Sequence, residues 1–456
     1  MDSTNSPEIH WRGFLAAMTA AAAFMIVSPR PLARAGAVAA NSPIQVEFIG
    51  FGSQKLRVMF DFLPFPEVQA VAVADPLRSA AYYHQWGKNE FRDRVQNLLG
   101  VRSGWDWLSP NAPILSLSPT LSVPAGVARR KPAQRTGDAS GCTAFAAFRE
   151  MLDNENDIDA VVGCTTDLLH APAAIAAMKR GKHVFCQQRM SHSLPTARLM
   201  AEVAKSSSIA TQAVLPEQAS EETRRLCEWL SAVVMGRGTR VDNWSNRPSW
   251  PQGSAPPTDS SSLPERLDWN LWLGPTPSRP FHPAYLPFVW RGWTDYGCGA
   301  FGDMGCYSLD SIYHALKLTA PIAAEASGSG HSPETFPKAS IIHLDFPARD
   351  GLPSVNLTCY LGGLNRDAMD FYPKTRRDAF TDPPKTLPRS SDNEREWLDA
   401  VKEPKPPKPG ACFEFAAMVT EALHLGNLAA RTSERLTWDS ASSKLGASPA
   451  APAMAR

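Results

Sequence analysis

The sequence predicts an α/β protein of two domains: an N-terminal domain built on a parallel sheet, then an α/β domain with an open, mostly antiparallel sheet. The first observation is a strand, helix and strand within residues 157–190, where Ala160–Cys164 and the run from His183 are apolar and Gly181 ends the helix between them. Such a βαβ unit has parallel strands. The second observation is a group of later strands without intervening helices, typical of an antiparallel sheet, at 240–246, 320–327, 340–346 and 354–361.

The first strand of the chain begins at Ile44 and runs into a glycine-containing turn. A turn that binds a dinucleotide has glycine at three positions: for the tight turn, for the approach of the pyrophosphate and for close packing of the helix. Gly50 and Gly52 fill the first two positions, and Lys55 occupies the third. We therefore expect cofactor contacts from Gly50, Gly52, Ser53 and Gln54. The alternative is a plain turn whose helix lies further from the sheet.

The next strand, Val68–Ala74, ends at an acidic residue, Asp75. It lies 25 residues beyond Gly50, near the place where an acidic side chain binds the ribose 2′-hydroxyl of NAD. A carboxylate there repels the 2′-phosphate of NADP, so we expect NAD, with NADP the weaker alternative because Arg78 lies nearby.

Two polar triplets follow the strands of the βαβ unit: Thr165-Thr166-Asp167 and Gln187-Gln188-Arg189. The carboxyl ends of parallel strands lie at one edge of a sheet, and ligands bind at that edge. We therefore predict that these residues line a binding site, with Thr165, Thr166 and Gln187 near the cofactor.

The composition narrows the class of protein. At 456 residues the chain can form two domains with separate cores, and its 46 Lys and Arg nearly equal its 45 Asp and Glu. This balance gives no support for a nucleic-acid or membrane surface. The eight cysteines form no C-x-x-C pair and no zinc-ligand spacing, so we expect buried thiols and no metal site.

The chain divides by composition into a series of expected segments. A helical pattern resumes at Ala144–Leu152 after an irregular stretch. We expect a leader over 1–40, a nucleotide-binding domain over 41–213 with an insertion at about 99–140, a substrate and oligomerisation domain over 214–440 and a disordered tail over 441–456.

The N-terminal leader has features of an export signal. Phe14–Val27 is an uncharged apolar run that is short for a membrane span, and Ala33-Arg34-Ala35 offers a cleavage site. Trp11-Arg12 stands where a twin-arginine signal has two arginines. These features predict an exported, periplasmic protein with no membrane attachment after leader removal. The alternative is an uncleaved leader on a cytoplasmic protein.

Several longer segments resemble one family. They are DIDAVVGCTTDLLHAPAAIAAMKRGKHVFC at 157–186, SNRPSWPQG at 245–253, LDWNLWLGPTPSRPFHPAYLPFVWRGWTDYG at 267–297, GAFGDMGCYSLD at 299–310 and TEALHLGNLAARTSERLTWD at 420–439. From Pro43 to about Asp439 the chain resembles the Gfo/Idh/MocA oxidoreductases, in particular their secreted, twin-arginine-led subgroup. The resemblance implies a Rossmann domain followed by an α/β domain whose open sheet faces the active site, and a homo-oligomer.

The resemblance also implies catalytic positions, and this chain departs from them. Members carry Cys-Glu-Lys-Pro where this chain has Cys186-Gln187-Gln188-Arg189, so Gln188 stands at the lysine that contacts nicotinamide ribose and substrate. Members also carry Asp-x-x-x-His on one helical face, and here the pair is Asp303 and Tyr307. The usual Asp-His-Trp-His keeps one histidine, His170, which lies either near the cofactor or in the interior.

A loop just before Asp303 supplies the candidate substrate contacts. Trp290 and Arg291 lie there, and aromatic faces stack on sugar C–H surfaces while arginine donates to hydroxyls. The alternative is that both residues only pack the loop.

Three functions remain open at this stage. The first is an NAD(P)-dependent oxidoreductase acting on a sugar, polyol or glycoside with a proton relay altered at Gln188 and Tyr307. Glutamine does not titrate, and tyrosine accepts a proton only as tyrosinate. The second is an NAD-retaining enzyme of another kind, such as a glycosidase. The third is a catalytically impaired member that binds a sugar or a partner.

Overall fold

The structure, a computed structural model, describes most of both domains. The insertion predicted at about 99–140 lies outside the described residues, as does nearly all of the predicted leader. No helix among the described residues is long and apolar enough to cross a membrane. The described residues are 9–10, 43–50, 52–77, 79–80, 90, 93–94, 97, 143–155, 158–215, 220–232, 239–265, 267–286, 288–330, 332–362, 368–372, 383–387, 389 and 392–446.

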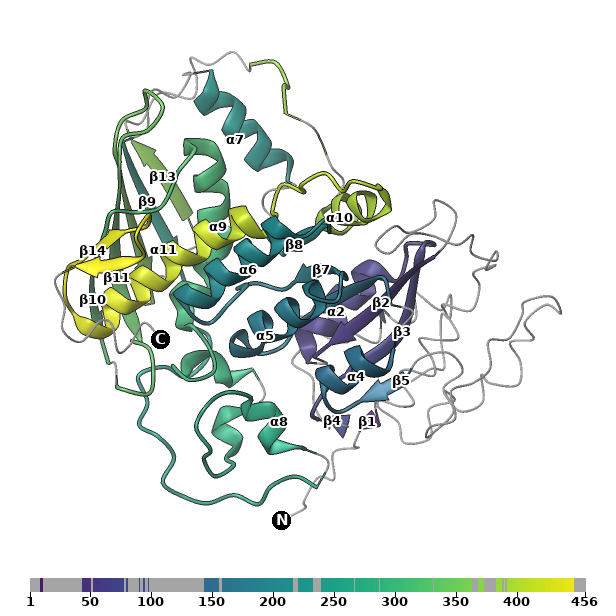
Figure 1. Cartoon of the computed structure of the whole chain (residues 1–456). Coiled ribbons are helices and arrows are strands. Elements are labelled where there is room, and N and C mark those ends of the chain that lie inside the picture. Colours follow the sequence, from purple (N-terminus) through teal and green to yellow (C-terminus); the bar gives the residue numbers. More distant parts are fainter. Residues whose placement is uncertain are drawn as a thin grey trace.

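A parallel sheet forms the N-terminal domain (Figure 1), as the sequence predicts. Chain order reverses between the two central strands, β2 and β6, and open α/β sheets bind ligands at such a point. In spatial order the strands of the described chain are β5 (Thr143–Phe145), β3 (Val68–Ala74), β2 (Ile44–Ile49), β6 (Ala160–Gly163), β7 (His183–Cys186) and β8 (Thr211–Ala213).

Helices cover both faces of this sheet. On one face lie α4 (Phe148–Asn154), α5 (Asp167–Met178) and α6 (Leu194–Ser206), and on the other lies α2 (Ser53–Phe62). The continuous apolar strands explain this arrangement, because a parallel strand is buried on both faces.

The second face is completed by a distant segment, α10 (Asn393–Lys402). Its Trp397 is fully buried, with its ring centroid 5.7 Å from that of Phe62 and 5.4 Å from that of Phe185. We expected this segment in the second domain, as part of 214–440. The packing of Trp397 places this segment in the first domain instead. The sequence gives no sign of it, because the hydrogen bond from Trp397 to the carbonyl of Ala210 joins residues 187 positions apart and leaves no local pattern.

The C-terminal domain is a mixed sheet in which only β9 and β12 pair in parallel. The helices α9 (Gly299–Leu316) and α11 (Phe413–Thr432) pack on one face, and α11 lies beside α6 of the first domain (Figure 1). In spatial order its described strands are β13 (Ala368–Tyr372), β9 (Arg240–Ser245), β12 (Val355–Leu361), β11 (Ala339–Phe346), β10 (Ala323–Ser329), β14 (Leu436–Asp439) and β15 (Lys444–Gly446).

Two local predictions are wrong. The helical pattern at Ala144–Leu152 begins with the edge strand β5, and the helix α4 starts only at Phe148, because residues 143–145 pair with β3. The tail predicted as disordered from residue 441 contains β15, which pairs with β14 through Thr437, Trp438 and Asp439. Backbone pairing decides both segments: β5 pairs with β3, which is distant in the chain, and β15 forms a hairpin with the strand just before it.

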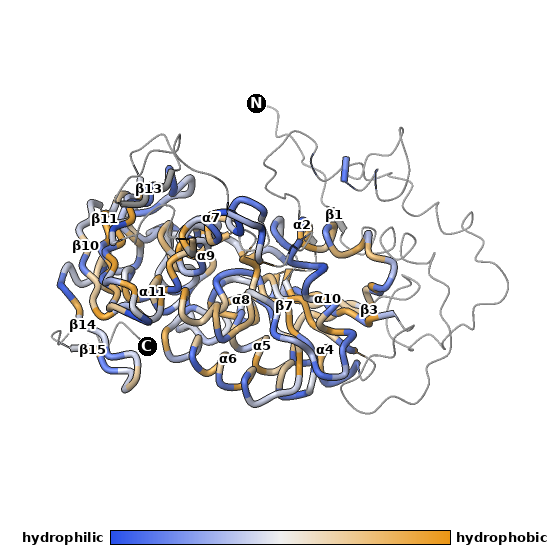
Figure 2. Tube along the Cα trace, turned by 90° about the horizontal axis from the view of Figure 1, so that it is seen from above, coloured by the Kyte–Doolittle hydropathy of each residue, from blue (hydrophilic) through white to orange (hydrophobic). Residues whose placement is uncertain are grey.

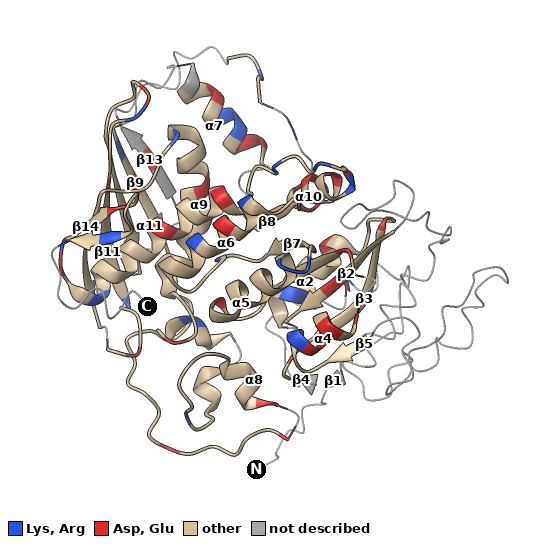
Figure 3. Ribbon diagram, viewed as in Figure 1, with Lys and Arg blue, Asp and Glu red and all other residues tan. Residues whose placement is uncertain are grey.

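Apolar residues gather along the strands of both sheets and the helices between them (Figure 2), and one buried cluster runs from the first domain into the second. Lysine and arginine are mixed with aspartate and glutamate over the described ribbon (Figure 3). The two domains therefore share a core, and the charge pattern agrees with the balanced composition.

One buried residue of the central strand opposes this apolar pattern. Glu47 in β2 is 0% exposed, and neither carboxylate oxygen has a hydrogen-bond partner. Burial, together with the nearby Glu155, raises the pKa of Glu47 to about 8. A carboxyl group with this pKa is protonated in the folded protein at neutral pH.

We predict that Glu47→Gln stabilises the protein at alkaline pH and changes little at pH 4. Between the ordinary pKa of 4.5 and the raised pKa of about 8, the carboxyl is ionised only in the unfolded chain, so wild-type stability falls as pH rises through that window. The variant lacks this loss and gains about 1–3 kcal/mol at pH 8. Denaturant unfolding at both pH values measures the difference. Equal gains at pH 4 and pH 8 would contradict a protonated Glu47.

Candidate active site

A cavity of about 590 Å³ lies between the two domains, where the strands β6 and β7 end and face α9 and β9. This volume is in the usual range of ligand pockets. It brings together nine of the residues singled out from the sequence: Gln54, Thr165, Asp167, Gln187, Gln188, Trp290, Arg291, Asp303 and Tyr307. The remaining seven do not line it: Gly50, Gly52, Ser53, Asp75, Thr166, His170 and Arg189.

The glycine turn has the geometry that a dinucleotide requires. Gly50 has φ +81°, and a Cβ there would lie 2.4 Å from the carbonyl oxygen of Cys164 in the neighbouring strand end. Gly52 caps the helix α2, and a Cβ there would meet no heavy atom within 4 Å. The first glycine thus permits the close turn, and the second leaves open space at a helix N-terminus, where a pyrophosphate binds.

The third position of the turn is filled by a buried side chain. Lys55 is 0% exposed, lies 4.6 Å from the ring centroid of Phe48 and donates to the backbone oxygen of Val162. It therefore reaches from α2 to the sheet. The sequence shows that the third position of the turn is lysine and not glycine. The structure shows that the amine of this lysine is buried against the sheet.

Asp75 lies at the end of β3, where the sequence places the ribose-binding acid. Its Oδ1 accepts a hydrogen bond of 2.6 Å from the backbone N–H of Leu77. This bond fixes the carboxylate at the edge of the sheet. Its preference for NAD stays a prediction.

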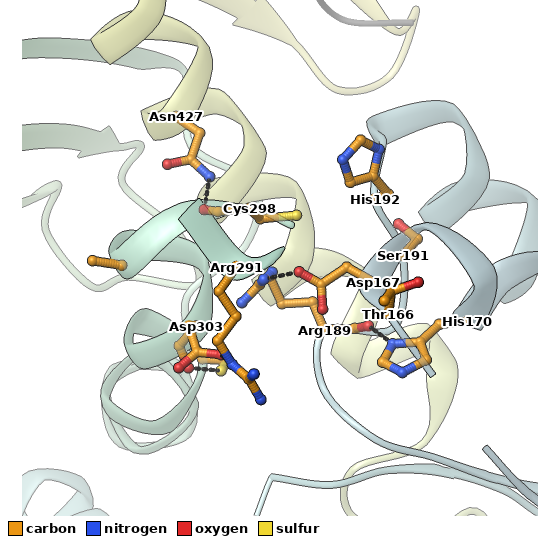
Figure 4. A network of polar contacts seen from close by, with 12 residues as sticks. Thr166, Asp167, His170, Arg189, Ser191, His192, Arg291, Cys298, Asp303 and Asn427 are labelled. Carbon is orange, nitrogen blue, oxygen red and sulfur yellow. Dashed lines mark hydrogen bonds and ion pairs between the residues drawn. The ribbon is translucent and has the colours of Figure 1, made fainter. Parts of the chain in front are cut away.

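A buried ion pair joins the two polar triplets (Figure 4). The guanidinium of Arg189 binds the carboxylate of Asp167, with 1% and 3% of the two side chains exposed. His170 Nδ1 lies 2.5 Å from the carbonyl oxygen of Arg189, and burial lowers the pKa of this imidazole. The Arg189 side chain is thus held by Asp167, and His170 supports the strand end from the interior.

The second domain closes over this pair. A Cβ at Gly302 of α9 would lie 2.8 Å from Nε of Arg189, and the thiol of Cys298, just before α9, interacts with both charged groups. Only glycine allows the helix so close to the guanidinium. The pair therefore packs directly against α9, the helix that carries Asp303 and Tyr307.

Gln188 and Tyr307 meet across the cavity. Both residues line the cavity, the amide of Gln188 lowers the pKa of the Tyr307 hydroxyl, and Gln188 Oε1 has no hydrogen-bond partner among the described residues. Burial raises the pKa of Tyr307 above its ordinary value, and Cys306 and Asp303 raise it further. The hydroxyl is therefore protonated at neutral pH and can donate to a ligand.

The carboxylate of Asp303 is held by the segment that carries Trp290 and Arg291. Its Oδ1 accepts a bond of 3.1 Å from Nε of Arg291, whose guanidinium lies 4.5 Å from the ring centroid of Trp290 and 4.8 Å from that of Phe288. Trp290 and Arg291 belong to the short helix η4 (Val289–Gly292). Both predicted substrate contacts line the cavity, and Arg291 also neutralises the carboxylate.

Sequence reasoning missed the wall contributed by β9 and the loop after it. The motif at 245–253 was noticed but given no role. The polar and aromatic residues at the end of this strand, next to the motif at 245–253, are the sequence feature that could have indicated this wall of the cavity. The missed lining residues are Asn243, Trp244, Ser245, Arg247 and Trp250.

The charges of the cavity limit its chemistry. Its described lining contains no histidine, lysine or glutamate, and both of its aspartates are ion-paired to arginine. Burial raises the pKa of the one lining thiol, Cys164. The site therefore offers hydrogen-bond donors, aromatic faces and a protonated tyrosine, and it lacks a group that accepts protons near neutral pH.

We predict that replacing each of the two turn glycines by alanine has a different effect: one change weakens cofactor binding, and the other lowers the stability of the protein. Gly52→Ala leaves the apo protein about as stable as wild type, because its Cβ meets nothing, and weakens NADH binding about tenfold or more by entering the path of the pyrophosphate. Gly50→Ala lowers stability through its contact with Cys164. The control is Gly181→Ala, which also has positive φ (+71°) but meets no atom. Unchanged NADH affinity in Gly52→Ala would place the cofactor elsewhere.

We predict that Arg189→Met lowers the free energy of unfolding by about 3–5 kcal/mol, because it leaves the carboxylate of Asp167 buried and unpaired. Asp153→Asn is the control, since its pair with Arg180 is exposed and should contribute less than about 1 kcal/mol. Denaturant unfolding measures both variants. A loss in Arg189→Met no larger than in Asp153→Asn would show that the buried pair does not stabilise the domain contact.

Comparison with known proteins identifies the family. Residues 113–213 match the model of an oxidoreductase family with an NAD-binding Rossmann fold, and residues 227–351 match its C-terminal α/β domain, both of the Gfo/Idh/MocA type. The first match begins at residue 113, which is downstream of the glycine turn. In that turn Lys55 stands at the third glycine position.

One curated relative is the 1,5-anhydro-D-fructose reductase of Ensifer adhaerens, 26% identical over 189 residues, which are 40% of this chain and 44% of the relative. The match thus spans less than half of the relative's length.

Two solved structures share the fold: an NAD-binding protein from Listeria innocua and the scyllo-inositol dehydrogenase of Lactobacillus casei with NAD(H) and scyllo-inositol. Each is 13% identical with a TM-score of 0.52; they cover 87% of this chain, which spans 97% and 99% of theirs. The motifs, both family models and the two-domain fold agree, and the chain belongs to the Gfo/Idh/MocA oxidoreductase family.

Proposed function

We propose that this protein is a nicotinamide-dependent oxidoreductase acting on a sugar, polyol or glycoside, and that its altered proton relay suits reduction of a carbonyl group. The observation that carries the proposal is that one cavity between the domains brings together Gln188, Tyr307 and the Asp303–Arg291 pair. The family membership and the reductase activity named for the Ensifer adhaerens relative support it.

The residues present fit a dinucleotide. Gly50 and Gly52 would accommodate the pyrophosphate at the N-terminus of α2, and Asp75 would bind the adenosine ribose. Gln187 and Gln188 each carry a buried Oε1 without a protein partner, available to a ribose hydroxyl or the carboxamide. When bound, the nicotinamide supplies or accepts a hydride. Asp75 favours NAD over NADP.

The protein's part in the reaction is to supply a proton and hold the sugar. Tyr307 is protonated at neutral pH, so it can donate its proton to the oxygen that becomes an alkoxide when a carbonyl is reduced. Gln188 lines the same cavity, and its amide would orient this hydroxyl by donating to its oxygen. Trp290 offers a face for the sugar ring, and Arg291 holds Asp303 as an acceptor for sugar hydroxyls.

A second candidate is a binding protein without turnover. The absence of a free proton acceptor among the described lining residues favours it, because oxidation of an alcohol requires one. In this case the cavity would retain cofactor and sugar but transfer no hydride.

Export and oligomerisation stay predictions. The leader motif and cleavage site lie outside the described residues, and the open face of the C-terminal sheet is the expected subunit contact. Mass measurement of the native protein tests both.

We predict that Tyr307→Phe lowers the rate of NADH-dependent reduction of a keto-sugar panel by about 10²–10⁴-fold, with the NADH affinity unchanged, because only the proton donor is lost. Tyr360→Phe is the matched control, since Tyr360 stacks on Trp244 and does not line the cavity. Gln188→Lys should raise the rate of alcohol oxidation by introducing a group that lowers the pKa of Tyr307.

The outcomes separate the two candidates. Equal rates in wild type and Tyr307→Phe would contradict the proposed relay. Wild-type protein that binds NADH and sugars but turns over none of them in either direction would favour the binding protein. Fluorescence titration gives the affinities, and tighter binding of NADPH than of NADH would contradict the role of Asp75.

A further inference from the structure

Lys55 is an unusual residue for its place. It occupies the third glycine position of the turn, one helical turn after the N-cap Gly52, yet its side chain is fully buried between α2 and the sheet. A buried ammonium is costly unless it is paired. Within the described chain its contacts are one carbonyl oxygen, that of Val162, and the face of Phe48, and no carboxylate lies within ion-pair distance.

The position of the ammonium relates it to the glycine turn. Val162 precedes Cys164 in β6 by two residues, which is about 6–7 Å along a strand. The carbonyl of Cys164 is the atom against which Gly50 packs. The amine is therefore buried beneath the strand end against which the turn packs, with no exposed surface of its own.

A charge at this depth acts through a medium of low polarity. At an effective dielectric of about 20, two unit charges about 10 Å apart interact strongly enough to change an affinity by about tenfold. The groups that face Lys55 are the thiols of Cys164 and Cys186, the carboxylate of Asp75 at the end of β3, and the imidazole of His170 from α5. None of them is a buried partner that neutralises it.

Resting on the proposed function, we propose that Lys55 is an electrostatic binding residue for the cofactor: a buried cation that takes the place of the third glycine and attracts the pyrophosphate without touching it. The bound anion then adds to the counter-charge that the carboxylate of Asp75 supplies from beyond ion-pair distance. Burial lowers the pKa of Lys55 to about 8, so the amine is charged at neutral pH in the free protein and loses its proton at alkaline pH. Affinity for a pyrophosphate should fall over the same range.

The test uses ADP-ribose, which contains the pyrophosphate without the nicotinamide, and adenosine, which lacks it. Lys55→Met keeps the length of the side chain and removes the charge. The control is Lys182→Met, because Lys182 donates to a backbone oxygen, that of Ile158, at the other end of β6, away from the turn. Calorimetric titration at pH 7 and pH 9.5 measures the affinities of the full-length proteins.

At pH 7, Lys55→Met should bind ADP-ribose about tenfold more weakly than wild type, and Lys182→Met within twofold. Adenosine affinity should not change in either variant, and wild type and Lys55→Met should converge at pH 9.5. Equal ADP-ribose affinity of wild type and Lys55→Met at pH 7 overturns the proposal. Absence of ADP-ribose binding by wild type instead overturns the proposed function.

Folding provides a second readout that does not depend on the cofactor. The folded-state pKa of Lys55 is lowered from 10.5 to about 8, so between these values the amine is charged only in the unfolded chain. Wild-type apo protein should therefore gain stability as pH rises through this window, relative to Lys55→Met. A Lys55→Met protein that is less stable than wild type at pH 7 would show that the amine is held by the protein itself, and this also overturns the proposal.

Discussion

The buried ion pair between Asp167 and Arg189 is the interaction on which the site depends. It joins the start of α5 to the end of β7, and Gly302 lets α9 of the second domain lie directly against the guanidinium. Because His170 also holds the backbone of Arg189, the strand end is fixed from two sides (Figure 4). The neighbouring Gln188 is thereby placed opposite Tyr307. A charged pair at this depth stabilises only as a pair, so neither member can change alone.

Pairing of charges also determines which chemistry the cavity can support. Each aspartate that lines it is neutralised by an arginine, one buried and one stacked among aromatic rings. A carboxylate held in this way has a fixed position and can accept hydrogen bonds from hydroxyls. Burial keeps Tyr307 protonated, and Gln188 cannot accept a proton. The proposed relay would therefore start from a proton donor, which favours the direction in which a carbonyl becomes an alcohol.

Local patterns predicted the frame of the protein but not its long-range contacts. The apolar strands and the spacing of Gly50, Gly52 and Asp75 were sufficient for the parallel sheet and its binding edge. The resemblance placed Gln188, Asp303 and Tyr307, and the cavity unites them. Three features could not be predicted: the return of α10 to the first domain, the burial of Lys55 and the direction of Arg189. Each depends on a partner far away in the chain, Phe185, Val162 and Gly302 respectively.

The pH dependence of hydride transfer tests the central claim most directly. Single-turnover transfer of deuterium from labelled NADH to the keto sugar that is reduced fastest isolates the chemical step from product release. Because Tyr307 stays protonated and the described lining contains no histidine, lysine or glutamate, we expect a rate that is constant between about pH 6 and pH 9. A rate that changes tenfold per pH unit around an apparent pKa near 7 would contradict this account, since it requires a titrating group that the described cavity does not contain.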